Sequence, residues 1–290
     1  MNYQYHKLCL YFYFTAGMLI LSGCAPEIRK PVQVCPGKGS VAEAVSALQS
    51  HTQNMVPLKA NGQCLLEYYV KEKPKPHKEK FSVKLWLNPP VEIYLQGDAT
   101  LVPKAIVLGS NEREFWLSIR PKEISTYWWG KWSQQDSSET LMINPKTLLE
   151  ALGIAAVDAE PNWSLSNEGA FDVLIKHQRG LVTKKIYVYT CDYLVKRIEY
   201  FDVYGQVAAV AELDNYKQVL EGFFVPASIK IGECAQDNLE DSLSITLDLK
   251  SIKPTKITER QQNVLFNRPQ PRGFKRLIRI VGVKWIEQPQ

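Results

Sequence analysis

The sequence has few histidines and carries none of the short motifs that mark common enzyme families. Only His51, His77 and His177 lie beyond the apolar N-terminal segment. No Gly-x-Ser-x-Gly, His-Glu-x-x-His or dinucleotide-binding glycine pattern occurs. Residues that are distant in sequence can still form a catalytic site after folding, so a hydrolase remains an alternative. We expect a protein that is not an enzyme and needs no cofactor.

The chain also lacks the patterns of metal-binding and nucleic-acid-binding proteins. It has no Cys-x-x-Cys pair and no histidine at ligand spacing from a cysteine, so we expect no metal site. The formal net charge of +5 is spread along the chain, and no basic run is interleaved with aromatic residues. Nucleic acid is therefore not an expected partner.

The N-terminus has the layout of an export signal. A polar stretch with one cation, Lys7, precedes an apolar run over residues 8–21, which is shorter than the ~20 residues of a bilayer span. The sequence Leu-Ser-Gly-Cys at residues 21–24 resembles the lipobox of bacterial lipoproteins, whose cysteine carries the lipid. We expect residues 1–23 to be a signal peptide. Lipid on Cys24 would then anchor the chain, each buried methylene contributing about 0.8 kcal/mol.

The residue after this cysteine bears on the destination of the chain. Enteric lipoproteins that stay at the inner membrane tend to have an aspartate there, whereas this sequence has Ala25. We therefore expect a lipid-anchored protein of the bacterial envelope, on the outer membrane and facing the periplasm. The alternatives are an ordinary secretory signal with an incidental Cys24, or a short signal anchor.

Cysteine use is consistent with an oxidising compartment. Besides Cys9 in the signal and Cys24, four cysteines remain as candidates for two disulfides, and three pairings are possible. The pairing that we favour joins the nearest neighbours in sequence, each bond contributing about 3–4 kcal/mol in the loop-entropy model. The expected bonds are Cys35 with Cys64 and Cys191 with Cys234.

The first folded element is expected to be a helix that begins after a tether. Residues 24–39 would be the lipidated N-terminus and linker, because they are rich in proline and poor in apolar residues. Ser40 followed by Glu43 predicts a capping box. The next apolar residues share one helical face, and the helix is expected to end near Gln53. These residues are Val41, Ala44, Val45 and Leu48.

A second, shorter helix is expected in the middle of the chain. Asn144 is a suitable N-cap and Pro145 suits the first helical position, while Gly153 suits the C-cap. On both sides of this helix, apolar and polar residues alternate with period two, and turn residues recur about every ten positions. Such alternation predicts a mainly β protein, an antiparallel sheet partly covered by two or three short helices.

An aromatic cluster is the most distinctive local feature. Residues 127–132 read Tyr-Trp-Trp-Gly-Lys-Trp, with three tryptophans in five positions. One interpretation is a strand with Trp129 packed inside. The other is an aromatic wall for a lipid, formed by Trp128 and Trp129, or a loop that enters the membrane surface.

The order of these parts resembles the carriers and receptors of the Lol lipoprotein-localisation system. The matching parts are the helix from Ser40, the strands from Cys64 onward, residues 115–119 leading to 127–130, the helix at 144–153, and residues 224–231. Residues 263–267 resemble the final strand-to-tail segment of that family. The resemblance covers residues 40–269 and implies a strongly curved, unclosed half-barrel of antiparallel strands capped by helices. Residues 270–290 would be a basic C-terminal tail.

The resemblance further implies that the concave face binds acyl chains without catalysis. A lipid-anchored chain fits a receptor or sensor better than a diffusing shuttle, with a lipoprotein or another amphiphile as ligand. The alternative is an envelope lipoprotein with a structural or protein-interaction role, in which the same residues are packed core. The candidate lining residues, besides Trp128 and Trp129, are Val83, Leu85, Leu87, Phe115, Leu117, Ile119, Leu243, Ile245 and Leu247.

Overall fold

The computed structural model describes residues 33–69, 75–120, 125–134, 145–153, 162–233, 243–282 and 284–289. The chain divides into two units, Met1–Gln33 and Val34–Gln290, and the fold below is that of the second. Cys24 with the expected signal peptide, Asn144 and Cys234 lie outside the described residues. Their expected roles stay predictions.

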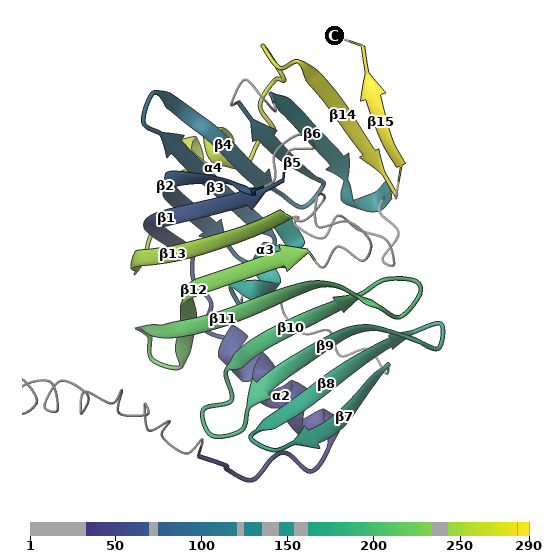
Figure 1. The fold of residues 1–290 in the computed structure, drawn as a ribbon. Coiled ribbons are helices and arrows are strands. Elements are labelled where there is room, and N and C mark those ends of the chain that lie inside the picture. The colour runs from purple at the N-terminus through teal and green to yellow at the C-terminus, as the bar shows by residue number, and fades with distance from the viewer. Residues whose placement is uncertain are drawn as a thin grey trace, which may run out of the picture. The chain divides into compact units, whose positions relative to one another are not determined.

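The described part of the second unit folds into one large sheet of 15 strands (Figure 1). The strands are β1 (Leu58–Tyr68), β2 (His77–Asn88), β3 (Glu92–Ala99), β4 (Val102–Ser110), β5 (Glu114–Ile119), β6 (Thr126–Lys131), β7 (Trp163–Glu168), β8 (Phe171–Gln178), β9 (Leu181–Tyr189), β10 (Val195–Phe201), β11 (Val207–Leu220), β12 (Phe223–Glu233), β13 (Leu243–Pro254), β14 (Arg276–Val281) and β15 (Lys284–Gln288). Their order in the sheet is β15-β14-β6-β5-β4-β3-β2-β1-β13-β12-β11-β10-β9-β8-β7. The edge strands β15 and β7 do not pair, so the sheet is open.

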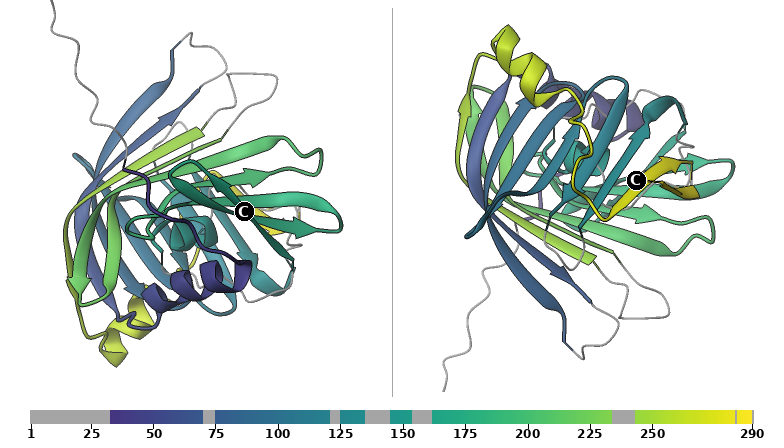
Figure 2. Two further views of the ribbon diagram at one scale, coloured as in Figure 1. Left: turned by 90° about the horizontal axis from the view of Figure 1, so that it is seen from below. Right: turned by 90° about the horizontal axis from the view of Figure 1, so that it is seen from above.

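The sheet is strongly bent. Helix α3 (Pro145–Ala151) contacts both β4 and β11, although six inter-strand steps separate these strands. In a flat sheet six steps would span about 29 Å, more than twice the ~10–12 Å diameter of a helix. The sheet therefore curves around α3, as the two views in Figure 2 show. The predicted fold class, an open, mainly antiparallel sheet with short helices, is confirmed.

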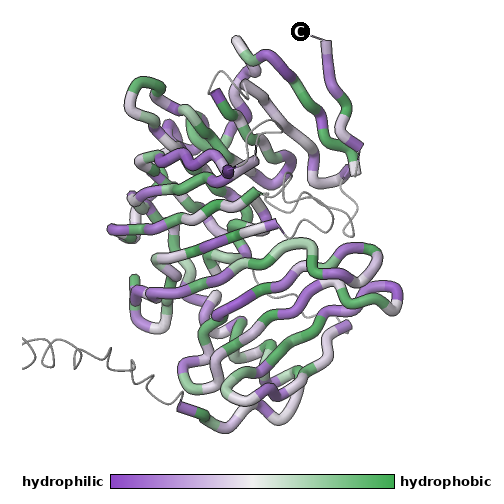
Figure 3. The backbone as a smooth tube through the Cα atoms, in the orientation of Figure 1, coloured by the Kyte–Doolittle hydropathy of each residue, from purple (hydrophilic) through white to green (hydrophobic). Residues whose placement is uncertain are grey.

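The concave face holds the main apolar core. Along the strands, hydrophobic and hydrophilic residues alternate (Figure 3), so one face of each strand supplies apolar side chains. In β2 these are Phe81, Val83, Leu85 and Leu87, all at most 2% exposed. They form one cluster with Leu48 and other buried residues of α2 and α3. The two helices thus cover apolar surface that the bent sheet would otherwise leave in water.

Helix α2 (Val41–Thr52) begins and ends where the sequence predicts. The hydroxyl of Ser40 accepts a hydrogen bond from the backbone N–H of Glu43. The carboxylate of Glu43 accepts one from Gly39 instead of Ser40, a one-residue variant of the expected capping box. The helix contacts β7, β8 and β12, and so covers the second half of the sheet.

The C-terminal segment differs from the expectation. The segment 263–267 is not a strand-to-tail connection, because residues 259–265 form a helix, α4 (Glu259–Leu265). A capping box of Thr258 and Gln261 begins this helix. Residues 276–288, expected to be part of a tail, supply β14 and β15. Strand β14 pairs with β6 in the only parallel pair of the described sheet.

The convex face of β3 to β6 is covered as well. The ring of Trp116 is fully buried against Tyr127 and Phe274. It lies so close to Gly109 on the neighbouring strand that a Cβ at that position would approach the ring within 2.4 Å. Glycine is therefore needed at this position for the tryptophan to pack. The connection before β14, which contains Phe274, shields this face from water.

Candidate binding cavity

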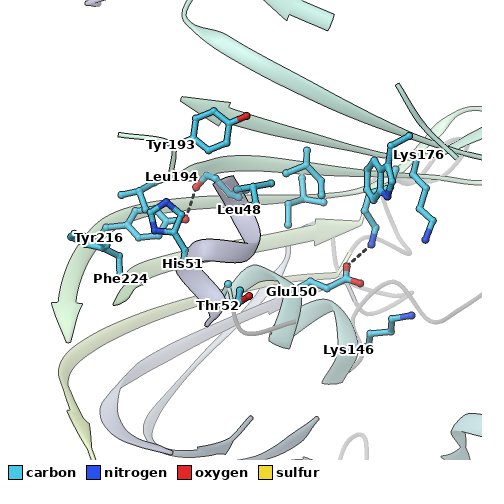
Figure 4. Close-up of a pocket in the computed structure, with 16 residues that line it drawn as sticks. Leu48, His51, Thr52, Lys146, Glu150, Lys176, Tyr193, Leu194, Tyr216 and Phe224 are labelled. Atoms are coloured by element: carbon cyan, nitrogen blue, oxygen red, sulfur yellow. Dashed lines mark hydrogen bonds and ion pairs between the residues drawn. The ribbon is translucent and has the colours of Figure 1, made fainter. Parts of the chain in front are cut away.

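A cavity of about 270 Å³ lies on the concave face, between the two helices and the second half of the sheet (Figure 4). Its volume is close to the lower end of the ~300–1,000 Å³ that ligand pockets usually have. It has room for one small ligand or one chain. The lining residues are Leu48, His51, Thr52, Lys146, Glu150, Gly153, Trp163, Lys176, Lys184, Ile186, Tyr193, Leu194, Val195, Ile198, Tyr216 and Phe224.

Two lysines of the cavity lie side by side because of a β-bulge. The β8–β9 hairpin turns at Arg179-Gly180, both with positive φ, and pairs Gln178 with Leu181. A bulge next to His177 then shifts the register. As a result Lys176 pairs with Lys184 instead of Thr183, and both lysines are directed into the cavity.

An acid on α3 neutralises one of these lysines. Oε2 of Glu150 lies 2.8 Å from the Lys184 Nζ and accepts a hydrogen bond of 2.9 Å from the Tyr200 hydroxyl. The side chains of Glu150 and Lys184 are only 15% and 19% exposed. Burial raises the pKa of Glu150, but Lys184, Lys146 and the Tyr200 hydroxyl together hold it below its ordinary value. Burial, together with Glu150, also raises the pKa of Tyr200 well above its usual range.

The other end of the cavity is aromatic and aliphatic. Figure 4 shows Lys146 and Lys176 at one end and His51, Tyr216 and Phe224 at the other. His51 of α2 and Phe224 of β12 meet edge to face, with ring centroids 6.3 Å apart. The Tyr216 hydroxyl donates a hydrogen bond to the carbonyl of Val195. This end therefore presents ring faces and methyl groups, with the tyrosine hydroxyl already satisfied.

A network beside the cavity holds the start of α2 against the sheet. The Asp172 carboxylate is completely buried and accepts hydrogen bonds from the Lys38 backbone N–H at 2.8 Å, the Asn167 amide at 2.7 Å and the Tyr193 hydroxyl at 3.2 Å. Burial, and then the Asp172 charge, raises the pKa of Tyr193, so this hydroxyl stays a donor. The backbone that leads into α2 is thereby fixed to β8 and to the β9–β10 turn.

A disulfide reinforces this connection and corrects the expected pairing. Cys35 is bonded to Cys191, across 156 positions of the sequence. Cys64 is a free, buried thiol on β1. The expected bonds of Cys35 with Cys64 and of Cys191 with Cys234 are therefore wrong, because the fold brings the N-terminal segment to the β9–β10 turn and not to β1.

The lining residues proposed from the sequence lie elsewhere on the sheet, and none borders this cavity. Val83, Leu85, Leu87, Ile119 and Leu247 are buried members of the main core, and Leu117, Leu243 and Ile245 pack against it. Phe115 packs on the ring of Trp132. As ligand contacts, these residues stay a prediction.

The two tryptophans of the aromatic cluster occupy opposite faces of β6. The ring of Trp128 meets Trp285 of β15, with ring centroids 5.0 Å apart. The guanidinium groups of Arg268 and Arg279 both lie over the ring of Trp129, 4.2 and 5.3 Å from its centroid. The expectation that Trp128 and Trp129 contact a ligand stays untested.

The sequence analysis missed the lysines and the glutamate of the cavity. Neither Lys176 nor Lys184 stands out in the sequence, since a lysine within an alternating strand pattern is normally exposed. The one sequence feature that could have indicated a polar site here was Glu150, an acidic residue on the apolar helix that precedes Gly153. In the part of the chain that the structure describes, no group of three or more histidine, cysteine, aspartate or glutamate side chains is placed to hold a metal ion.

The described helices are all short. None of them combines the length and the apolar character that crossing a bilayer would require.

The fold places the chain in a recognisable structural class. No family model matches the sequence, and no curated protein does. The crystal structure of a domain assigned to outer-membrane lipoprotein sorting, from Vibrio parahaemolyticus, is similar with a TM-score of 0.53 and 13% identity, over 77% of this chain and 97% of that one. At this identity the similarity shows the fold alone, an open and bent β-sheet.

Two further structures are more distant. A LolA superfamily protein from Nitrosomonas europaea has a TM-score of 0.47 and 9% identity, over 77% of this chain and 97% of that one. A DUF1329 family protein from Desulfovibrio piger has a TM-score of 0.49 and 12% identity, over 78% of this chain and 97% of that one.

Proposed function

We propose that this protein is a lipid-anchored lipoprotein of the bacterial envelope that binds an acyl chain in the cavity beneath α2 and α3. The observation that carries the proposal is the cavity itself, about 270 Å³ on the concave face of an open sheet. Open sheets of this kind expose apolar surface that a chain can cover. The protein would act as a membrane-bound receptor or sensor for a lipidated or amphiphilic ligand.

The N-terminal sequence supports the anchoring half of the proposal. Leu-Ser-Gly-Cys ends an apolar run of signal-peptide length, so that Cys24 would carry acyl chains. With Ala25 in place of the aspartate that retains enteric lipoproteins at the inner membrane, the chain would go to the outer membrane. A receptor fixed in this way can collect ligands from diffusing carriers or from the membrane surface. Neither role needs a reactive group in the cavity.

Two experiments test the two halves separately. Growth of expressing bacteria with radiolabelled palmitate should label the full-length chain, and Cys24→Ala should abolish the label. Native mass spectrometry of the full-length Cys24→Ala chain should find bound lipid, or take up added fatty acid at one molecule per chain. If no amphiphile binds and a stable protein partner copurifies instead, a structural role replaces the binding role.

A further inference from the structure

Cationic residues occur along the whole chain, but their excess over acidic residues lies at its C-terminal end. Residues 268–290, here called the C-terminal segment, contain six lysines and arginines and a single acidic residue, Glu287. The 267 residues before them contain 29 cationic and 29 acidic residues. The formal net charge of +5, expected to be spread along the chain, therefore comes from this segment alone. Such an asymmetry indicates a surface that meets an anionic partner.

Acidic residues of the adjoining strands do not cancel this charge. Residues 111–144 include β5, β6 and the connections around them, and contain four cationic and five acidic residues, undescribed positions included. Together with the C-terminal segment they have ten cationic against six acidic residues. Two ion pairs form among them, Arg268 with Glu114 at 2.9 Å and Arg276 with Glu287 at 3.0 Å. These four strands and their connections therefore carry an excess of positive charge.

The fold makes the C-terminal segment part of the sheet. Strand β14 pairs with β6, and β15 pairs with β14 and ends the sheet (Figure 1). The guanidinium of Arg279 donates a hydrogen bond of 3.0 Å to the side-chain oxygen of Gln134 and lies over the Trp129 ring. The segment is thus a surface of paired strands, and its charges have defined positions on one edge of the molecule.

Strand β15 adds exposed apolar side chains to this charge. Trp285 and Ile286 are 49% and 46% exposed, and as consecutive residues of a strand they point to opposite faces. The Trp285 ring packs against Trp128, with ring centroids 5.0 Å apart, which orients it. Lys284 precedes them and is exposed as well. The free edge of the sheet therefore presents an aromatic and an aliphatic side chain beside cationic ones.

A bilayer of anionic phospholipid matches both features of this edge. Each Lys or Arg close to such a surface strengthens binding about fivefold. Tryptophan favours the headgroup level, where its ring lies in an apolar layer while its N–H stays near water. A stable protein partner would bury about 800 Å² on each side, whereas β15 is five residues long and exposes two large apolar side chains. A bilayer requires no such matched area.

We propose that the C-terminal segment docks on a bilayer of anionic phospholipid, with Trp285 and Ile286 in the headgroup region and the cationic side chains around them on the lipid phosphates. This inference rests on the proposed attachment to a membrane and adds a second contact, separate from the lipid on Cys24. Cys35 ties the start of the fold to the β9–β10 turn, whereas β15 is at the other end of the strand order. Contacts at both ends would lay the sheet along the membrane.

The test measures vesicle binding by the expected mature chain without its lipid, residues 24–290 with Cys24→Ala, which keeps every described element. The probes are vesicles of phosphatidylcholine alone and of phosphatidylcholine with about 30% phosphatidylglycerol, which gives an anionic surface. Cosedimentation measures the bound protein. The anionic vesicles should bind at least about tenfold more tightly, and the difference should shrink as the salt concentration rises from about 0.05 to about 0.5 M.

Charge variants test the cationic side chains. Arg272 and Lys284 are both exposed, and replacing both by glutamine should weaken binding to the anionic vesicles at least about tenfold. Lys230→Gln with Lys253→Gln is the matched control, because it makes the same charge change at exposed positions of β12 and β13. The control should keep the affinity within about twofold.

Apolar variants test the insertion of the edge. Trp285→Ala should weaken binding to the anionic vesicles at least about threefold. Tyr204→Ala, which removes an aromatic ring that is 82% exposed in the β10–β11 turn, should have no such effect. Ile286→Ser on the other face of β15 provides a second reading if Trp285→Ala loosens the strand. Unchanged binding of both β15 variants would overturn the proposed insertion.

Other results would also overturn the proposal. Equal affinity for the two kinds of vesicle would remove the lipid charge from it, and an equal loss in the control pair would show that only total charge acts. Polyaspartate that binds as tightly as the anionic vesicles would identify an acidic protein as the partner. Failure of the chain to take up palmitate or fatty acid would remove the proposed function and leave the vesicle result unchanged, so the two can fail separately.

Discussion

Lys184 of β9 and Glu150 of α3 form an ion pair of 2.8 Å that joins the helix to the concave face of the sheet. Both side chains are less than one-fifth exposed, and the Tyr200 hydroxyl donates to the same carboxylate oxygen. Each charge of the pair therefore compensates the other for the hydration that is lost on burial. The ion pair also fixes the position of α3 relative to the strands.

Breaking this pair should destabilise the protein. Lys184→Gln leaves the Glu150 carboxylate without its main partner, and we expect a loss of about 1–3 kcal/mol in the free energy of unfolding, between the values of exposed and fully buried pairs. Lys185→Gln, an equal charge change on the same strand, should cost less than about 0.5 kcal/mol. Urea denaturation measures both. Equal effects of the two substitutions would mean that the pair contributes little.

The Cys35–Cys191 bond should stabilise the N-terminal segment and the placement of α2. Replacing both cysteines by alanine removes a long loop constraint from the unfolded chain, and we expect the free energy of unfolding to fall by about 2–5 kcal/mol. Non-reducing peptide mapping checks the bond in the wild-type chain. A peptide that joins Cys35 to Cys64 would contradict the structure, and an unchanged melting temperature of the double variant would contradict the expected stabilisation.

The Cys64 thiol should be unreactive in the folded protein. Burial raises the pKa of Cys64 to about 12 from an ordinary 9.0, which lowers its thiolate fraction near neutral pH about a thousandfold. Iodoacetamide at pH 8 should therefore leave Cys64 unmodified, and should label it once guanidinium unfolds the chain. Mass spectrometry of the Cys64 peptide gives the result, and rapid labelling of the native protein would contradict it.

Gly109 should tolerate no side chain while Trp116 packs on it. A Cβ at this position would lie 2.4 Å from the indole ring. Gly109→Ala should therefore lower the free energy of unfolding by about 1–3 kcal/mol through overpacking. Gly232→Ala on β12 is the matched control, because its nearest neighbour would be 4.0 Å away. If the clash is the cause, the smaller ring in a Trp116→Phe background should reduce the cost of Gly109→Ala, which a double-mutant cycle measures.

Glu233 should make the fold less stable as the pH rises from acid to neutral. Burial raises the pKa of this residue from 4.5 to about 7, so the folded state holds a proton that the unfolded state releases earlier. Its stabilising contribution is complete below pH 4.5 and is lost as the pH rises to about 7. Glu233→Gln should flatten this part of the profile of unfolding free energy against pH. If the unfolding free energy of Glu233→Gln varied with pH as that of the wild-type chain does, Glu233 would be excluded as the cause of the pH dependence.

Local patterns predicted much of the fold because their causes are local. The hydroxyl of Ser40 caps α2 through a residue three positions away, and Arg179-Gly180 turns the β8–β9 hairpin within two residues. The alternation in β2 similarly predicts which side of that strand is buried. These interactions connect residues that are adjacent or nearly adjacent, so a single sequence is enough to recognise them.

The positions of the cavity residues depended on longer-range pairing. The bulge beside His177 decides that Lys184, and not Lys185, lines the cavity. A one-residue change of register reverses every side chain of a strand. Neither residue type nor spacing shows where such a bulge occurs. The same holds for β14, whose parallel partner β6 lies about 150 residues earlier.

The sequence by itself determined an alternating, mainly β chain with two predictable helices, behind a segment that resembles a lipoprotein signal. Only the tertiary structure decided that Cys35 meets Cys191, that the sheet wraps around α3 and that Glu150 reaches Lys184. Residues that are neighbours in sequence constrain each other through backbone geometry. Residues on distant strands meet only through the packing of the whole sheet, which no local pattern encodes.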